Sequence, residues 1–228
     1  MASNKFIIRD DTQSPRDADF ILAAFDGSLP HLASKGSGQQ WGARPFSERD
    51  GVRDRVESWI AASEASRRGE QGVEPGRLFV AEVELDPSEV TEEGVSVRTD
   101  PESGRRLLSV AAAGVRKDWW PTYFKQFDHL QKLVEGEDAA GGVMYLEVLI
   151  SDFRTGSARK GAGAVLLHKV KEYAVAKGAT KLYLDCFAGN DGNLVKFYEA
   201  QGFVSVADFV DEKNGGWPGR VLKMDLTS

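Results

Sequence analysis

The sequence predicts an α/β fold in which helices pack on a mixed sheet, and three observations support this. Short apolar or alternating stretches, typical of strands, alternate along the chain with stretches of helical spacing. Two of the predicted helices are followed by glycine, Gly178 and Gly202, where a helix C-terminus is expected. The chain has 228 residues and no internal repeat, so we expect residues 1–228 to form a single domain.

The first half of the chain is predicted to hold three strands and two helices. Ser14 and Pro15 have the pattern of an N-cap and a first helical residue, and Gly27 is expected to end that helix. Alternation of apolar residues over 78–85 predicts a strand, which pairs with the next strand as an elaborated hairpin. The predicted elements are strands 6–9, 78–85 and 106–115, helices 16–25 and 47–66, and loops 27–46, 67–76 and 86–104.

The second half is predicted to alternate strands and helices. A long loop, 116–142, contains an aromatic stretch over 119–127 and a short helix-like stretch to Val134, and the rest of the chain is more regular. The predicted elements are strand 143–153, helix 163–177, strand 182–187, helix 193–201, and strands 203–206 and 220–226. The predicted order is therefore β-α-α-β-β-β-α-β-α-β-β.

A glycine-rich turn separates strand 143–153 from the helix that follows it. Residues 159–164 read Arg-Lys-Gly-Ala-Gly-Ala. Glycine lets the backbone pass close to a ligand, and the first turn of a helix leaves N–H groups free to bind a phosphate. Leu166 stands where the Rossmann fingerprint has its third glycine, and Gly163 is not followed by Lys-Ser/Thr as a Walker A loop requires. The turn therefore predicts a phosphate site of another kind.

A second motif follows at 190–203, Asn-Asp-Gly-Asn-Leu-Val-Lys-Phe-Tyr-Glu-Ala-Gln-Gly-Phe. Gly161-x-Gly163 followed by Phe197-Tyr198-Glu199 and Gly202-Phe203 resembles the GNAT superfamily of acyl-CoA-dependent N-acetyltransferases. The spacing between the two blocks fits that family as well. The motifs cover about 144–206, and the looser strand order covers nearly the whole chain. The resemblance implies a GNAT-like, mostly antiparallel central sheet flanked by helices.

The resemblance also implies acetyl-CoA as the acetyl donor. Its pyrophosphate would lie on the N–H groups of the glycine turn, and its pantetheine would bond to the end of strand 143–153. That strand would separate from strand 182–187 to open a slot. The implied cofactor-binding residues are Ser151, Asp152, Phe153, Arg159, Lys160, Gly161, Ala162, Gly163, Ala164, Asn190, Asn193 and Tyr198.

Acetyl transfer to an amine requires a base for the amine and a proton or hydrogen bond for the leaving thiolate. Tyr198 is the candidate for the second role, because its counterpart in the family lies near the cofactor sulfur and a phenol is protonated at neutral pH. Glu147 is the candidate base, directly or through water, because an acid in an apolar strand should have a raised pKa. Asp152 and Asp185 are rivals for that role, and ordered water is another alternative.

The resemblance also implies that the acceptor binds among the loops around the first two helices and the middle strands. Aromatic and amide side chains there suit a partly apolar amine, although the same residues would also serve as a small core beneath the loops. The candidates are Gln40, Trp41, Trp119, Trp120 and Tyr123. We therefore predict an N-acetyltransferase for a small-molecule amine. A protein or peptide amine as acceptor, and a non-catalytic acyl-CoA-binding module, remain open alternatives.

Composition and charge argue against several other classes of protein. The net charge of −6 and the pI near 5.2 argue against a nucleic-acid footprint, and no apolar run reaches the length of a membrane span. Cys186 is the single cysteine, and a small buried side chain is favoured over an acetyl-cysteine there. The three histidines lack metal-ligand spacing, so no metal is expected. We expect a cytoplasmic protein, with the oligomeric state open and a homodimer among the options.

Overall fold

One continuous sheet organises the chain in the computed structural model, which describes residues 5–72, 75–86, 88 and 91–226. The strand order is β1-β2-β4-β5-β6-β8-β7, and β3 pairs with β4 outside this path. All neighbours pair antiparallel except β5 and β6. The strands are β1 (Phe6–Arg9), β2 (Gly76–Glu84), β3 (Val97–Thr99), β4 (Arg106–Lys117), β5 (Val143–Ser151), β6 (Lys181–Phe187), β7 (Val204–Asp211) and β8 (Trp217–Asp225).

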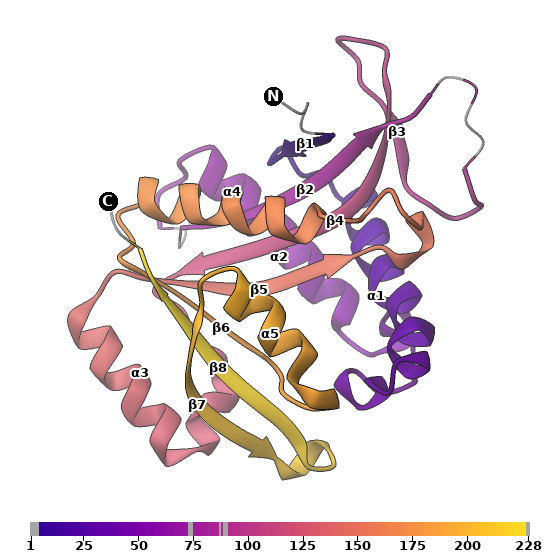
Figure 1. The fold of residues 1–228 in the computed structure, drawn as a ribbon. Coiled ribbons are helices and arrows are strands. Elements are labelled where there is room, and N and C mark those ends of the chain that lie inside the picture. Colours follow the sequence, from indigo (N-terminus) through magenta and orange to yellow (C-terminus); the bar gives the residue numbers. More distant parts are fainter. Residues whose placement is uncertain (1–4, 73–74, 87, 89–90, 227–228) are drawn as a thin grey trace.

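Helices cover both faces of the sheet (Figure 1). On one face α4 and α5 pack on a core that includes Phe79, Leu166 and Leu184. On the other face α1 and α2 pack on a second core, and α3 with the segment before it covers a third. The helices are α1 (Arg16–Ser34), α2 (Val52–Arg67), α3 (Asp128–Ala140), α4 (Ala162–Ala176) and α5 (Asn193–Ala200). The sheet is therefore the middle of three layers, as the α/β prediction requires.

Alternation along the strands assigns side chains to the two faces. In β6, Leu184 and Cys186 lie in the core beneath α4 and α5, while Tyr183 lies in the core beneath α3. Successive side chains of a strand point to opposite faces, so Asp185 shares the face of Tyr183. This places Cys186 and Asp185, although adjacent in sequence, on opposite sides of the sheet.

Strands β5 and β6 run side by side only at their beginning. Their parallel pairing covers Val143 to Tyr145, and Tyr145 opposite Tyr183 is the last paired position. Beyond it β5 remains bonded to β4, and β6 remains bonded to β8. The two halves of the sheet therefore separate in the middle. The slot expected from the sequence between strands 143–153 and 182–187 is present in the fold.

A β-bulge lies where the strands begin to separate. Val115 of β4 pairs with Leu146 of β5, and Gly114 pairs with Val148, so Glu147 is the extra residue. A bulge bends its strand and reorients the side chains next to it. Here it places Glu147 on the same face as Val148, toward α2.

Several sequence-based boundaries were wrong. Gly27 does not end the first helix: it lies within α1, its Cα next to the Arg154 side chain, and the helix continues through Pro30 to Ser34. Residues 135–140 are helical in α3 rather than part of a loop. The short β3 lies inside the loop predicted over 86–104, and β7 extends five residues beyond the strand predicted over 203–206, to Asp211. Parts of two predicted loops, residues 73–74 and 87, 89 and 90, lie outside the described residues.

None of the helices in the described ranges combines the length and the apolar character needed to cross a membrane.

Candidate active site

The glycine turn lies directly at the N-terminus of α4. Gly161 is the N-cap with a φ of 91°, a left-handed conformation that favours glycine, and Ala162 begins the helix. The N–H groups of Lys160 and Ala162 donate to the carbonyls of Ser157 and Arg159. No described residue accepts a hydrogen bond from the N–H of Gly161, Gly163 or Ala164. The turn thus offers a cluster of free donors at the positive end of a helix dipole.

Arg159 adds a guanidinium to this turn. It lies 3.8 Å from the centre of the Phe153 ring, and the ring of His31 from α1 stacks on the same phenylalanine at 4.0 Å. The Arg159 Nε is buried and has no hydrogen-bond acceptor within the described chain. Burial lowers the pKa of Arg159. The pKa of His31 is also lowered, first by burial and then by the positive charges of Arg159 and Lys35. Lys160 beside it is exposed.

Asp152 has a structural role in this region. Its carboxylate accepts from the backbone N–H of Arg154 and from the Arg154 guanidinium at 2.7 and 2.9 Å. It is completely buried, and it caps the short 3-10 turn that begins at Phe153. Because its oxygens are used inside the protein, Asp152 is poorly placed to act as the rival base considered from the sequence.

The free edge of β5 offers backbone groups to the slot. The N–H of Asp152 donates to Val110 of β4 at 2.9 Å. Backbone groups alternate between the two edges of a strand, so Leu149 and Ser151 direct theirs away from β4. On that side β5 has no paired strand beyond Tyr145 among the described residues. These groups can bond to an extended ligand in the slot.

Tyr198 lies on the α4–α5 side of the slot. It is buried in α5 and packs edge to face on Phe203, with the ring centres 5.7 Å apart. Burial raises its pKa, and the charges of Cys186 and Asp185 add to that effect. The preceding residue, Phe197, reaches the glycine turn: its ring lies 3.5 Å from the position that a Cβ on Gly163 would occupy. The two motifs found in the sequence are therefore in contact.

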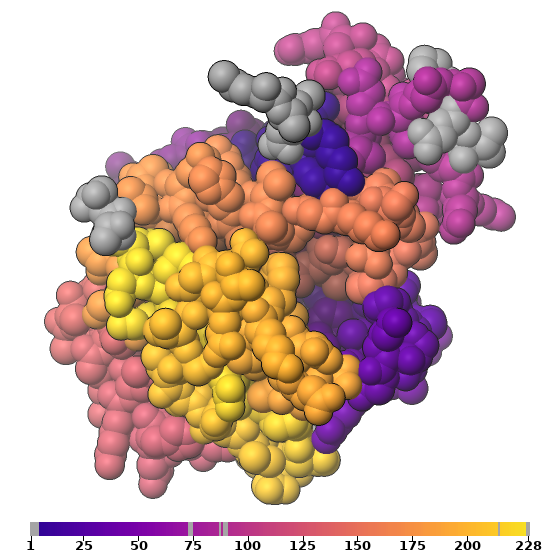
Figure 2. Space-filling model, viewed as in Figure 1, coloured from indigo at the N-terminus to yellow at the C-terminus, as the bar shows by residue number. Residues whose placement is uncertain are grey.

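Asn190 and Asn193 begin α5 and connect it to α1. The Asn190 amide donates to the carbonyl of Lys35 at 2.9 Å and to the hydroxyl of Ser37 at 2.5 Å. Asn193 in turn donates to the Asn190 carbonyl at 2.8 Å. Figure 2 shows the surface hollowed between α5, α1 and the segment before α4. The Asn190 side chain is therefore bonded within the protein, to the segment that follows α1.

Glu147 faces α2. Its carboxylate lies 3.8 Å from the Arg116 guanidinium and accepts a hydrogen bond from Trp59. Burial raises its pKa, and the charge of Arg116 partly opposes that effect. It lines a cavity of about 80 Å3 between α2 and strands β2, β4 and β5. The expected raised pKa is present, next to a cation that the sequence did not reveal.

Asp185 is a second carboxylate of interest, two positions beyond the last β5–β6 pair. It accepts a hydrogen bond from the Tyr145 hydroxyl, and the Tyr123 side chain is hydrogen-bonded to the same carboxylate. Burial raises the pKa of Asp185, and these two hydrogen bonds partly oppose it. Tyr145 entered the sequence analysis only as an apolar neighbour of Glu147. Knowing the β5–β6 register would have identified Tyr145, because it lies at the last β5–β6 pair and on the same face as Asp185.

The predicted acceptor residues fall into two groups. Trp119, Trp120 and Tyr123 pack around Tyr145, with both tryptophan rings in contact with the Tyr145 ring. Trp41 lies apart from them, between Phe25 and Phe46. The remaining residue, Gln40, has its carbonyl bonded to the indole N–H of Trp217 at 2.9 Å. The structure therefore brings the 119–123 residues to the slot and places the Trp41 ring in the core beneath α1.

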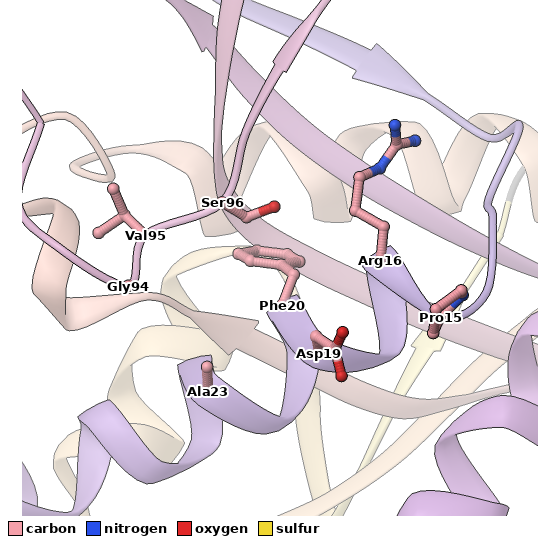
Figure 3. A pocket seen from close by; sticks show the side chains of 8 residues that line it. All are labelled: Pro15, Arg16, Asp19, Phe20, Ala23, Gly94, Val95 and Ser96. Carbon is pink, nitrogen blue, oxygen red and sulfur yellow. The ribbon is translucent and has the colours of Figure 1, made fainter.

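A larger cavity of about 470 Å3 lies elsewhere, between the start of α1 and residues 94–96 (Figure 3). Arg16, Asp19, Phe20 and Ser96 are among its lining residues. None of the residues predicted for the donor or the acceptor lines it. Within the described part of the chain, no group of three acidic, histidine or cysteine side chains is arranged to hold a metal ion.

The turn, Phe197 and Tyr198 lie within a segment that matches a known family. Residues 153–203 match the model of the acetyltransferase (GNAT) family. This part of the chain is similar in sequence to GNAT acetyltransferases. This segment begins where β5 ends and includes α4, β6 and α5, which are the elements that form the glycine turn and the α5 side of the slot. No curated protein matched the chain in sequence.

Solved structures confirm the GNAT-like fold across nearly the whole chain. The structure of yncA from Salmonella typhimurium with its cofactor acetyl-CoA has a TM-score of 0.56 at 13% identity, covering 99% of this chain and 96% of that one. A spermidine N-acetyltransferase from Vibrio cholerae, in complex with CoA and spermine, gives 0.52 at 14%, covering 98% and 97%. A ribosomal-protein-alanine N-acetyltransferase from Brucella melitensis gives 0.53 at 16%, covering 96% and 99%.

Proposed function

We propose that this protein is a GNAT acetyltransferase that transfers the acetyl group of acetyl-CoA to the amine of a small molecule. The observation that carries the proposal is the junction of two features: free N–H donors at the start of α4 and the separation of β5 from β6 beside them. The first fits a pyrophosphate, and the second fits an extended chain that ends in a thioester. Acetyl-CoA, bound in this way, supplies an activated acetyl group.

The residues present fit the pyrophosphate and the pantetheine of that donor. Gly161, Gly163 and Ala164 offer N–H groups to the phosphates, and Arg159 lies beside them with its Nε free of any described acceptor. Leu149 and Ser151 offer backbone groups to the pantetheine. The chemistry of these donors is that of an anion site followed by an amide-binding strand edge.

Two side chains complete the proposed chemistry. Tyr198 donates a hydrogen bond or its proton to the leaving thiolate, and burial keeps its phenol protonated at neutral pH. Glu147 accepts the proton of the acceptor amine, directly or through water, and its raised pKa suits a base that works near neutral pH. Tyr198 lies beneath α5 on one face of the sheet, and Glu147 lies on the opposite face, toward α2.

A small acceptor is favoured over a protein segment because contacts bridge the two sides of the slot. The Asn190 amide bonds to Lys35 and Ser37 after α1, and the Gln39 amide donates to the carbonyl of Gly215 at 3.2 Å. The Trp217 indole bonds to Gln40 in the same region. A long peptide would need these bonds broken, whereas a small amine would not.

The test is the release of free CoA thiol from acetyl-CoA over a panel of amines. The panel contains small aliphatic and aromatic primary amines, a lysine-containing peptide and a peptide with a free N-terminal alanine. Turnover with a small amine and not with the peptides supports the proposal. Turnover with a peptide alone would show a protein acceptor. Binding of acetyl-CoA without release of thiol over the panel would show a non-catalytic acyl-CoA-binding module.

A further inference from the structure

Asp185 is a carboxylate without a counter-ion. Its hydrogen-bond donors, Tyr145 and Tyr123, are neutral phenols, and no cationic group is among the described residues that act on it. The arginine opposite its neighbour Cys186 in the sheet, Arg220, is bonded to Asp208 at 2.5 and 3.0 Å. Charges in protein interiors are normally paired, so an unpaired one marks a place for an outside cation.

A second carboxylate bonded to a tyrosine lies on the same face of the sheet and can be compared with Asp185. Glu137 of α3 accepts a hydrogen bond from the Tyr183 hydroxyl at 2.7 Å, and Lys181 forms an ion pair with it. Tyr183 pairs with Tyr145 in the sheet, so the two carboxylates are each held by one tyrosine of the same pair. Among the described residues, Glu137 is paired with Lys181, whereas no lysine or arginine is paired with Asp185.

Access and surroundings also fit a cationic ligand. Asp185 keeps part of its surface exposed, two positions beyond the last β5–β6 pair. Trp119 and Trp120 are half-buried and lie with their rings 5.5 and 5.7 Å from the Tyr145 ring. The Arg116 guanidinium already lies over the Trp119 ring at 4.5 Å, so the two tryptophan rings suit the apolar body of a ligand, and Asp185 suits its ammonium group. Both features of an organic amine thus have a complement here.

We propose that Asp185 binds the protonated amine of the acceptor, and that Trp119 and Trp120 contact the apolar part of the same molecule. The acceptor class is therefore a small organic primary ammonium rather than an uncharged amine or an amine that also carries a carboxylate, such as an amino acid. This inference rests on the proposed function. It gives the two carboxylates separate roles, because Asp185 selects and holds the ammonium while Glu147 accepts its proton.

The experiment measures binding first. The protein saturated with CoA is titrated by calorimetry with methylammonium, butylammonium, benzylammonium and 2-phenylethylammonium chlorides, and with 2-phenylethanol as a neutral analogue. We expect the aromatic ammonium ions to bind and the alcohol to bind at least about 10-fold more weakly. In Asp185→Asn we expect ammonium affinity to fall on the order of 10- to 100-fold, with the weak affinity for the alcohol unchanged.

Glu137→Gln is the matched control, because it neutralises a tyrosine-held carboxylate that already has its lysine. It should leave ammonium affinity within about 2-fold of wild type, since its carboxylate is already paired with Lys181. In turnover assays Asp185→Asn should raise KM for the amine more than it lowers kcat, and Asp185→Glu should restore part of the loss. Equal affinity of Asp185→Asn and wild type for every ammonium probe would overturn the inference.

The remaining outcomes distinguish failure of this inference from failure of the proposed function. If wild type binds CoA but none of the four ammonium ions, the acceptor class is wrong. If wild type does not bind acetyl-CoA, the proposed function fails rather than this inference alone. Should Asp185→Asn not fold, amide NMR shifts of wild type on adding 2-phenylethylammonium or 2-phenylethanol replace it. Shifts at Asp185 and Tyr145 that are no larger for the ammonium ion than for the alcohol would overturn the inference.

Discussion

Arg159 lies over the ring of Phe153, with its guanidinium carbon 3.8 Å from the ring centre. The contact holds a cation at the edge of the glycine turn, next to the free N–H groups of Gly161 and Gly163. Its Nε is buried without an acceptor among the described residues, and burial lowers the pKa of Arg159. A partly buried guanidinium with an unbonded N–H would be stabilised more by a bound anion than a fully hydrated guanidinium would be.

His31 should report the arrival of that anion. It stacks on Phe153, and its pKa is lowered by burial and by the charges of Arg159 and Lys35. Phosphates bound beside Arg159 add negative charge, which favours the imidazolium form, so the His31 pKa should rise by roughly one unit. Titration of the His31 ring by NMR, with and without acetyl-CoA, measures this.

Acetyl-pantetheine provides the control, because it carries the thioester without the pyrophosphate. It should leave the His31 pKa where it stands in the free protein. An equal rise with both ligands, or no rise with acetyl-CoA, would place the phosphates away from Arg159.

The second prediction concerns Gly163. A Cβ added there would lie 3.5 Å from Phe197 and 3.9 Å from Leu149, which are ordinary contacts. Gly163→Ala should therefore fold. In Gly163→Glu the new carboxylate faces the phosphates, and we expect acetyl-CoA affinity to fall by at least about 100-fold in calorimetry.

Val175→Glu is the matched control, because Val175 is exposed near the other end of α4 and the variant gains the same charge. It should keep acetyl-CoA affinity within about 2-fold of wild type, since charges far from a site act on it weakly through salt solution. Equal losses in both variants would mean that total charge, rather than the position of Gly163, decides binding.

The sequence predicted the donor side of the slot better than the acceptor side, for a physical reason. The glycine turn and the α5 motif are local patterns, because a left-handed Gly161 and a helix N-terminus depend on neighbouring residues. Both motifs lie within residues 153–203, which match the GNAT family model, and they could be recognised without knowing how the strands pair. The separation of β5 from β6 followed from the same family resemblance.

The acceptor side depends on contacts between distant residues. The hydrogen bond from Tyr145 to Asp185 spans 40 positions, and it requires the β5–β6 register. Arg116 beside Glu147 likewise comes from another strand. Helix ends failed similarly: Gly27 has the composition of a terminator, but packing against Arg154 keeps it inside α1. In these places tertiary contacts outweigh local preference.

Tyr198 provides a third prediction. Tyr198→Phe keeps the ring on Phe203 and removes the hydroxyl, so acetyl-CoA affinity should stay within about 2-fold while kcat falls on the order of 100-fold. Tyr173→Phe is the control: that hydroxyl donates to Gly76 at 3.2 Å, on the far side of α4 from the slot. Stopped-flow release of CoA thiol measures both. A kcat in Tyr198→Phe equal to that of the control would remove Tyr198 from the chemistry.

The pH dependence of kcat provides the fourth prediction. Glu147 acts as a base only when ionised, and burial raises its pKa, so kcat should rise with pH above the ordinary glutamate range of about 4.3. Arg116 and Arg55 face its carboxylate and lower its pKa, while Trp59 donates a hydrogen bond to it.

Removing one of these cations tests the assignment by the direction of a shift. In Arg116→Gln the Glu147 pKa should rise further, and the acidic limb of the kcat profile should move to higher pH. In Glu147→Gln the limb should disappear and kcat should fall on the order of 100-fold at neutral pH. Glu137→Gln, in which the altered carboxylate is the one bonded to Tyr183 and Lys181, should change neither the acidic limb nor kcat. A limb that survives in Glu147→Gln, or that stays in place in Arg116→Gln, would show that another group removes the proton, because the charge of Arg116 reaches Glu147 directly.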